Sequence, residues 1–409
     1  MGEGRCRLCA ARLEHIFADL GTTPLANSFL RPEQLETIEP SYPLRAFVCA
    51  RCLLVQVEEY APPEAIFRDY AYYSSYSQSW LAHARAYVDQ VVARFGLDEH
   101  SQVVEIGSND GYLLRNFRER EIPVLGIDPA ANVARVAIRQ GVPTLVEFFG
   151  TRFARALSVE SPADLAIANN VLAHVADLHD FVAGLRLLLA PGGVVTIEHP
   201  HLLAVIEENQ FDTIYHEHFS YFSLSTAKAV LEQHGLRIFD VAELPTHGGS
   251  LRLFACHMDD SRSQAPIVAD VLARERAAKL DRLTTYGDFA RRIAAQKRAI
   301  LALLTDLKRD GCSIAAYGAP AKGNTLLNYC GIGRDLIDYT VDLNPHKQGR
   351  FLPGSRIPIH SPDAIRATRP DIVLILPWNL REEIVAQLAY VREWGGRFAV
   401  RAPELQLVA

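Results

Sequence analysis

The sequence predicts an α/β protein in which a small N-terminal lobe precedes two Rossmann-like domains. Three observations predict it. Two Cys-x-x-Cys pairs lie near the start of the chain. Short apolar runs alternate with helix-patterned segments in two separate regions, as in doubly wound sheets. The first run of each region is followed by a glycine turn and a helix. The predicted parts are a lobe (1–70), a first Rossmann-like domain (71–260), a helical connector (261–310) and a second Rossmann-like domain (311–409).

The composition is that of an ordinary globular protein. The chain has 409 residues, 49% of them hydrophobic and 22% charged, enough for two or three domains. A formal net charge of −6 argues against a general nucleic-acid binder. No apolar run approaches the roughly 18 residues of a membrane span, and Met1–Cys6 has no apolar signal region. A cytoplasmic protein is therefore expected, without a membrane or nucleic-acid partner.

The four cysteines at the front predict a structural zinc site. Two pairs of thiolates about forty residues apart complete a tetrahedral site that leaves no position for water or substrate. Buried free thiols are the plain alternative, which two such pairs in one short segment disfavour. A redox role is weaker, because no βαβ pattern surrounds either pair. The metal would tie down a lobe too small for its own core. The predicted ligands are Cys6, Cys9, Cys49 and Cys52.

The segment from Phe67 to Ser79 (FRDYAYYSSYSQS) lacks helical or strand periodicity and is predicted to be a loop. Its tyrosines and serines suit contacts to a sugar, and equally suit a packing seam between domains. The spacing of apolar residues from Trp80 to Phe95 predicts a helix.

The first Rossmann-like domain opens with an apolar strand, Val103 to Ile106, and a glycine turn. Gly107 and Gly111 allow the backbone to approach a ligand. The spacing is not the dinucleotide fingerprint. A carboxylate near the strand end, Glu105, and the absence of a pyrophosphate cradle suit a cationic nucleoside better. Asn109 lies in the same turn.

The second strand, Val124 to Ile127, ends in Asp128, placed to hold two ribose hydroxyls. Taken alone, Asp128 could be a helix cap before Pro129, and the glycines an ordinary tight turn. Glycine loop, acidic residue and alternating pattern together predict an S-adenosylmethionine (SAM) site. This arrangement resembles the class I SAM-dependent methyltransferases.

Further strands are predicted at Val142–Val146, Asp164–Ala168 and Val194–Glu198, with a Pro-Gly-Gly turn before the last. Ligands of open α/β sheets bind beyond the carboxyl ends of the strands. Asn169, Asn170 and His174 follow such an end, although His174 could be a core histidine. Phe148 and Phe149 could contact adenine.

The run Tyr215-His216-Glu217-His218 places a phenol, two imidazoles and a carboxylate in four consecutive residues. It lacks the histidine spacing of a helical zinc protease. A carboxylate beside an imidazole, with a phenol nearby, indicates an oriented general base. A polar turn before the helix Ser225–Gln233 is the structural alternative. Arg252, on a late strand, could meet a phosphate or a carbonyl, or lie at the surface.

One or two long helices are predicted from Ser263 to Arg309, and a second α/β unit begins at Gly311. Lys322, on its first glycine turn, can neutralise a diphosphate, and Phe351 or Trp378 can stack on a base. A degenerate domain that serves only as scaffold is the alternative.

Over nearly the whole chain, six motifs occur in one order: CxxC…CxxC, VVEIGSNDGYLL, NNVLAHV, YHEHFSYFS, HGGSLR and YGAPAKGN. The chain thereby resembles the C-methyltransferases of nucleotide-linked 4-keto-6-deoxy sugars, which make branched antibiotic sugars. The resemblance implies a zinc lobe, a SAM-binding middle and a C-terminal domain that anchors the nucleotide sugar. It also implies that His218 is the base beside Tyr215 and Glu217, that His174 lines the active site, that Tyr70 and Tyr72 contact the sugar, and that Lys322 and Asn324 face the nucleotide.

The expected reaction starts with removal of the C3 proton, next to the C4 ketone, by His218. Tyr215 or His174 would stabilise the enolate, and Glu217 would either orient the base or hold the amino group of SAM. The alternatives are a C5 sugar enzyme, an O- or N-methyltransferase, and a zinc-knuckle RNA-binding protein. The expected carrier is thymidine diphosphate, and the expected state is a monomer.

Overall fold

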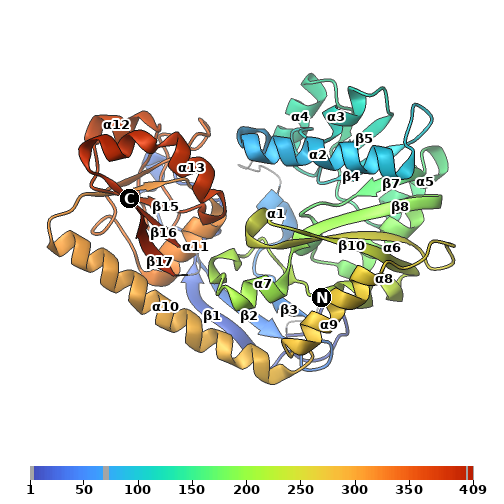
Figure 1. Cartoon of the computed structure of the whole chain (residues 1–409), viewed down its shortest axis with the longest axis horizontal. Coiled ribbons are helices and arrows are strands. Elements are labelled where there is room, and N and C mark those ends of the chain that lie inside the picture. Colours follow the sequence, from blue (N-terminus) through green and yellow to red (C-terminus); the bar gives the residue numbers. More distant parts are fainter. Residues whose placement is uncertain (1–3, 68–72, 402–403, 409) are drawn as a thin grey trace. The chain divides into compact units, whose positions relative to one another are not determined.

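The computed structural model describes residues 4–67, 73–401 and 404–408 (Figure 1). Its internal contacts divide the chain into two compact units, each made from separate stretches of sequence. The first unit comprises Met1–Glu14, Val48–Leu203 and Phe219–Leu283. The second comprises His15–Phe47, Ala204–His218 and Thr284–Ala409.

A seven-stranded sheet forms the centre of the first unit, in the order β10-β11-β8-β7-β4-β5-β6. The strands from β8 to β6 run parallel, whereas β11 lies antiparallel between β8 and β10. This is a doubly wound sheet closed by an antiparallel hairpin. Its strands are β4 (Val103–Ile106), β5 (Val124–Ile127), β6 (Thr144–Leu145), β7 (Ala163–Ile167), β8 (Leu189–Pro200), β10 (Leu236–Leu244) and β11 (Ser250–His257).

Helices cover both faces of this sheet. Val103 and Leu165 belong to a core packed with helices α2 and α3, and their neighbours Val104 and Ala166 belong to a core packed with α6 and α8. Figure 1 shows α2, α3 and α4 on one face and α6 and α8 on the other. The helices are α2 (Gln78–Phe95), α3 (Leu114–Arg118), α4 (Ala131–Arg139), α5 (Thr151–Glu160), α6 (Leu178–Leu188), α8 (Leu224–Gln233) and α9 (Pro266–Ala277).

The predicted strands of this unit are present, with differences in extent. The helix after the glycine turn is short, and β6 has two residues. The predicted Pro-Gly-Gly turn lies inside β8, where the ladder to β7 shifts register between Ala163 and Leu165. Gly192 has a φ of +76°, so the turn bulges from a strand that continues on both sides.

The second unit contains a six-stranded sheet in the order β14-β13-β12-β15-β16-β17, parallel except for β17. It confirms the second Rossmann-like domain. Its strands are β12 (Ile314–Tyr317), β13 (Tyr339–Val341), β14 (Ile359–His360), β15 (Ile372–Ile375), β16 (Arg397–Arg401) and β17 (Leu405–Val408). Its helices are α10 (Leu283–Arg309), α11 (Ala321–Cys330), α12 (Asp363–Thr368) and α13 (Arg381–Gln387).

The segment predicted as one N-terminal lobe divides between the units. Strands β1 (His15–Thr23) and β2 (Tyr42–Val48) are neighbours in a sheet. Phe17 of β1 stacks on Phe289 of α10, with ring centroids 4.3 Å apart. The two cysteine loops instead share the core of the first unit, to which Cys6, Cys49 and Leu54 belong. The N-terminal segment is too small to form a core of its own, and its parts pack into the cores of the two units.

Short elements complete the chain. Strand β3 (Val55–Val57) pairs antiparallel with β9 (Ser220–Tyr221). The others are α1 (Pro63–Phe67), α7 (Leu202–Glu207) and the 3-10 turns η1 (Pro32–Gln34), η2 (Ser74–Tyr76), η3 (Leu172–His174), η4 (Phe211–Thr213), η5 (Thr246–Gly248), η6 (Trp378–Leu380) and η7 (Ala389–Trp394).

Candidate active site

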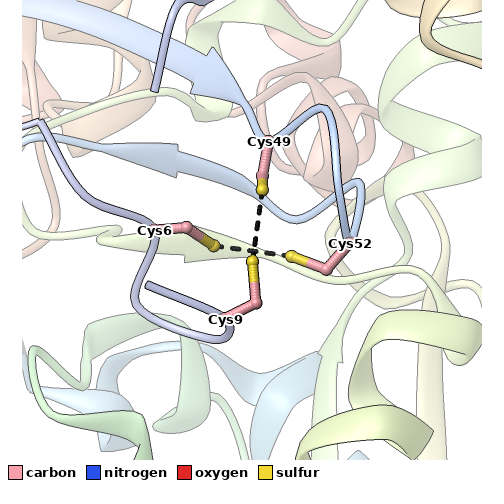
Figure 2. Close-up of side chains that lie close together, drawn as sticks. All are labelled: Cys6, Cys9, Cys49 and Cys52. Atoms are coloured by element: carbon pink, nitrogen blue, oxygen red, sulfur yellow. Dashed lines mark hydrogen bonds between the residues drawn. The ribbon is translucent and has the colours of Figure 1, made fainter. Parts of the chain in front are cut away.

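The four predicted zinc ligands meet in the first unit. The sulfurs of Cys6, Cys9, Cys49 and Cys52 all lie within 4.8 Å of one another and point toward a common centre (Figure 2). The Cys6–Cys52 and Cys9–Cys49 sulfurs are each 3.4 Å apart. Tetrahedral zinc with Zn–S bonds of about 2.3 Å separates its sulfurs by roughly 3.8 Å. The cluster therefore matches a closed zinc site.

Two backbone turns hold these cysteines. Ala10 and Leu53 each follow the second cysteine of a pair, and each is left-handed, with φ of 57° and 63°. Their amides donate to the carbonyls of Cys6 and Cys49, which closes each loop. Gln56 also donates from Nε2 to the Cys6 sulfur at 3.2 Å. No spacing signal pointed to Gln56, because it acts from a neighbouring strand.

The glycine turn after β4 requires its glycines. Gly107 has a φ of +69°, and a Cβ there would come within 2.5 Å of Cγ2 of Val171. Gly111 has a φ of +78° and packs against Val142. The backbone conformation and the close packing both exclude side chains at these positions.

Asp128 closes this turn from the end of β5. Its Oδ2 accepts a hydrogen bond from the Asn109 amide and its Oδ1 one from the Ala130 amide, both at 2.8 Å. Burial raises the pKa of Asp128 to about 6, although these two bonds oppose the rise. Pro129, predicted to contact the cofactor, lies between Asp128 and Ala130, and its contact stays a prediction. The predicted contact to ribose stays a prediction, and the contact seen is the cap.

Buried polar atoms gather where β4 and β7 end. Glu105 is 1% exposed, and burial, followed by the charges of Asp128 and Asp110, raises the pKa of its carboxyl. Among the described residues, the buried atoms without a hydrogen-bond partner include several at this edge of the sheet: Oε2 of Glu105, Oδ1 of Asp110, Oδ1 of Asn169 and Nδ2 of Asn170. Buried polar atoms normally have partners. A polar, cationic nucleoside would supply them, so these residues fit SAM.

Asn170 and His174 follow β7. Asn170 has a φ of 56° and its amide donates to the carbonyl of Glu198 at 2.6 Å. His174 ends the turn η3, and Phe67 meets its ring edge-on, with centroids 5.6 Å apart. The role of His174 in the reaction stays a prediction. Tyr70 and Tyr72, the predicted sugar contacts, lie outside the described residues.

The predicted base lies in the second unit, in a hydrogen-bonded chain. The imidazole of His218 shares its Nδ1 with the Thr213 carbonyl at 3.0 Å and its Nε2 with the Tyr215 hydroxyl at 2.7 Å. A carbonyl only accepts, so Nδ1 carries the proton and Nε2 offers its lone pair to the phenol. The sequence missed Thr213, because a backbone carbonyl leaves no signal in the residue type.

Glu217 is bound by a different partner. Its carboxylate is 2% exposed, and both oxygens lie 2.8 Å from Nδ2 of Asn27. The predicted role of Glu217 in orienting the base is not needed for the ring, since Thr213 fixes Nδ1. Asn27 was not predicted, because it lies far from the base in the sequence.

The residues predicted to face the nucleotide make contacts within the second unit. Trp378 is 5% exposed and donates from Nε1 to Asp212 at 2.7 Å. Lys322 Nζ lies 4.7 Å from the centroid of its ring, and the Arg401 guanidinium 5.7 Å. The ring is therefore buried beside cations, and its predicted stacking on a base stays a prediction.

Lys322 donates to Oδ1 of Asn379 at 2.9 Å, and burial lowers its pKa to about 8. Asn324 is 1% exposed, and its Nδ2 donates to the backbone carbonyl of Ala26 at 2.6 Å. Its contact to a nucleotide stays a prediction. Phe351 is half-buried and exchanges backbone hydrogen bonds with Leu30. Contacts of Lys322 and Phe351 to a nucleotide stay predictions.

Arg252 is neither at the surface nor open to a phosphate. It is 3% exposed, and its guanidinium contacts the Glu198 carboxylate at 2.8 Å. His83 lies 3.1 Å from the same carboxylate. Although burial opposes it, the hydrogen bond with His83 and the charge of Arg252 lower the pKa of Glu198 to about 2. The group is an internal ion pair of the first unit.

Comparison with known proteins identifies the family. Three family models match in succession: "Putative zinc binding domain" over residues 6–67, "Methyltransferase domain" over 80–241 and "C-methyltransferase C-terminal domain" over 245–403. The C-methyltransferase NovU of Streptomyces niveus is 39% identical over 405 residues, which cover 99% of this chain and 96% of that protein. The chain therefore belongs to the SAM-dependent C-methyltransferases that carry an N-terminal zinc-binding domain.

Other similarities are more limited. The trans-aconitate 2-methyltransferase of Azoarcus sp. (strain BH72) is 34% identical over 112 residues, 27% of this chain and 43% of that protein. The structure of magnesium protoporphyrin IX methyltransferase from Synechocystis PCC 6803 is 15% identical and covers 43% of this chain and 82% of its own, with a TM-score of 0.35. Among the described helices, none combines the length and apolarity of a membrane span.

Proposed function

We propose that the enzyme methylates C3 of a nucleotide-linked 4-keto-6-deoxy sugar, carried by thymidine diphosphate, and so makes a branched deoxysugar for a natural product. Membership of the C-methyltransferases supports transfer to carbon. The observation that carries the proposal is the Thr213–His218–Tyr215 chain. It offers an imidazole and a phenol side by side, as enolisation of a ketone needs.

His218 is the base of this proposal. Because the Thr213 carbonyl holds the proton on Nδ1, the lone pair of Nε2 remains to accept the C3 proton. The C3–H bond breaks, its proton passes to Nε2, and its electron pair moves through C4 onto the ketone oxygen. An imidazolium and an enolate result, so charge is balanced within the site.

Tyr215 is the donor to the developing enolate. Its hydroxyl lies 2.7 Å from Nε2, so the two groups can meet C3–H and the oxygen on the adjacent carbon. A preorganised donor at that oxygen lowers the barrier to enolisation. When bound, SAM supplies an electrophilic methyl group, which C3 takes as S-adenosylhomocysteine leaves. The imidazolium then returns its proton to solvent.

The test is mass spectrometry of the sugar in deuterated water. Without SAM, the enzyme is expected to exchange deuterium into C3 of a dTDP-4-keto-6-deoxy sugar. With SAM, the product gains one methyl group. His218→Asn should reduce the exchange at least about 100-fold while both ligands still bind. His257→Asn, a half-buried histidine on β11, is the matched control and should exchange normally.

Other outcomes of this experiment would contradict parts of the proposal. Exchange at C5 would move the methylation to C5. Methyl transfer without exchange would favour oxygen or nitrogen as acceptor. Full exchange by His218→Asn would remove the base assignment, and inactivity toward several nucleotide sugars would exclude the sugar substrate.

A further inference from the structure

Helix α11 occupies the position at which many Rossmann-like folds bind phosphate, after the glycine turn of β12. Two of its polar side chains contact the chain's own backbone instead. Nδ2 of Asn324 donates to the carbonyl of Ala26 at 2.6 Å. Oγ1 of Thr325 donates to the carbonyl of Ile214 at 3.0 Å. These side chains are buried, at 1% and 2% exposed, so both bonds are shielded from water.

The bond from Thr325 ends beside the base. Ile214 directly follows Thr213, whose carbonyl accepts the Nδ1 proton of His218. A shift of Ile214 would therefore move the carbonyl that fixes the tautomer and direction of the imidazole. Only one covalent step separates the residue held by α11 from the residue that holds the ring.

The bond from Asn324 ends beside Glu217. Ala26 precedes Asn27, whose amide contacts both carboxylate oxygens of Glu217 at 2.8 Å. The same short segment is fixed further along, where Leu30 and Phe351 exchange backbone hydrogen bonds. Asn27 is thus presented to Glu217 by a segment tied at both ends to the second Rossmann-like domain.

A third contact holds Asp212, three residues before Tyr215. Asp212 is fully buried, and its carboxylate accepts hydrogen bonds from Trp378 and Arg401 of the same domain. The domain that carries α11 therefore holds Asp212 and Ile214 directly, and it holds Glu217 through Asn27. These residues lie in the segment 212–218, which we call the base loop and which contains both Tyr215 and His218.

We propose that α11 positions the base loop, with Thr325 acting through Ile214 and Thr213 on His218, and Asn324 acting through Ala26 and Asn27 on Glu217. The inference rests on the proposed function, because it takes His218 as the base. The second Rossmann-like domain then has a positioning role in the reaction, in addition to any role in holding the nucleotide.

The reason to expect a catalytic effect is geometric. Proton transfer needs Nε2 within hydrogen-bond reach of the C3 proton, and small displacements of a base reduce its rate steeply. Substrate affinity depends less on this placement, because the base contacts one C–H bond of a large ligand. Loss of a positioning bond should lower the rate at saturating sugar and spare the Kd for the sugar.

The experiment compares Thr325→Val, which keeps the shape but removes the hydroxyl, with Thr325→Ser, which keeps the hydroxyl. Deuterium exchange at C3 without SAM is measured at saturating nucleotide sugar, beside the Kd values for the sugar and for SAM. Thr325→Val should lose about tenfold in exchange rate with both Kd values unchanged. Thr325→Ser should recover most of the rate.

Asn27→Ala tests the contact to Glu217 at a half-buried position. It should also lose about tenfold in exchange rate. Gln348→Ala is the matched control, since this half-buried amide donates to the backbone carbonyl of Asp342, a residue outside the base loop. Its exchange rate should equal that of the wild type.

Wild-type exchange rates in both Thr325→Val and Asn27→Ala would overturn the positioning role. So would equal losses in the valine and serine variants, or weaker sugar binding at an unchanged rate. Absence of exchange in the wild-type enzyme is a different result, because it would remove the proposed function and this inference with it.

Discussion

Asp128 combines a buried carboxylate with a pKa raised to about 6, principally by burial. A ligand whose hydroxyls donate to this carboxylate binds its ionised form. Below about pH 6 the group holds a proton that must leave on binding, so affinity falls as the pH falls. Above that pH the group is already ionised and affinity should be constant.

We therefore expect the Kd for SAM to rise by up to about tenfold per pH unit below pH 6. Titration calorimetry between about pH 7.5 and pH 5 measures it. S-adenosylhomocysteine has the same ribose and should show the same dependence. Asp128→Asn should bind weakly at every pH. Asp164→Asn, which alters a half-buried acid that accepts from the Gln102 amide, should keep the wild-type profile. A constant Kd across the range would contradict the ribose contact.

Single residues show where sequence reasoning succeeds and where it stops. Gly107, Gly111 and the four cysteines were predictable, because turn conformation and thiolate pairs leave signals in residue type and spacing. Asn27 and Thr213 were not, because one acts from far along the chain and the other through its backbone carbonyl. The bond from Trp378 to Asp212 was not predicted, since an aromatic ring after a strand suits a base and a buried indole equally, and stacking on a base stays a prediction.

Among the elements, the two cysteine loops have the clearest consequence for stability. Cys6 and Cys49 belong to the same core as strands β4, β7 and β8. Without the metal, four sulfurs within 4.8 Å of one another would lose the ion that balances their charge. Removal of zinc should therefore loosen the first unit as well as the loops themselves.

We expect chelation of zinc, or Cys6→Ser, to destabilise the first unit. Small zinc domains gain roughly 10 kcal/mol from the metal. A loss of even about 3 kcal/mol would lower Tm by roughly 6–12 °C in a unit of this size. Scanning calorimetry, with the zinc content measured in parallel, tests this. Cys312→Ser changes a half-buried cysteine outside the cluster and should leave Tm unchanged. A Tm that does not respond to zinc removal would exclude a structural role.

At the scale of the whole molecule, each unit is built from stretches that are not consecutive in the sequence. The stretch from His15 to Phe47 leaves the unit that contains the cysteine loops and joins the unit that contains α10 and α11. The predicted lobe 1–70 therefore contributes to two cores. The predicted domain boundaries at 70, 260 and 310 stay predictions. The internal contacts of the structure divide the chain at other positions.

A fragment of residues 1–67 with zinc should accordingly not fold cooperatively. Its cysteine loops would lack the core residues that α6 and α8 supply, and Phe17 would lack Phe289. Thermal unfolding followed by circular dichroism is the measurement, with the full chain as control. A sharp cooperative transition in the fragment, with one zinc bound, would show that the lobe is independent.

Sequence patterns alone predicted the class of fold, the zinc ligands, the glycine turn and the stretch that holds the proposed base. These features depend on local pattern: apolar period, glycine spacing and paired cysteines are all written in neighbouring residues. Three contacts became visible only in the folded chain: Thr213 holds the imidazole, Asn27 holds Glu217, and α11 contacts the base loop. Those contacts join positions up to about three hundred residues apart or use backbone atoms common to every residue, so no local pattern specifies them.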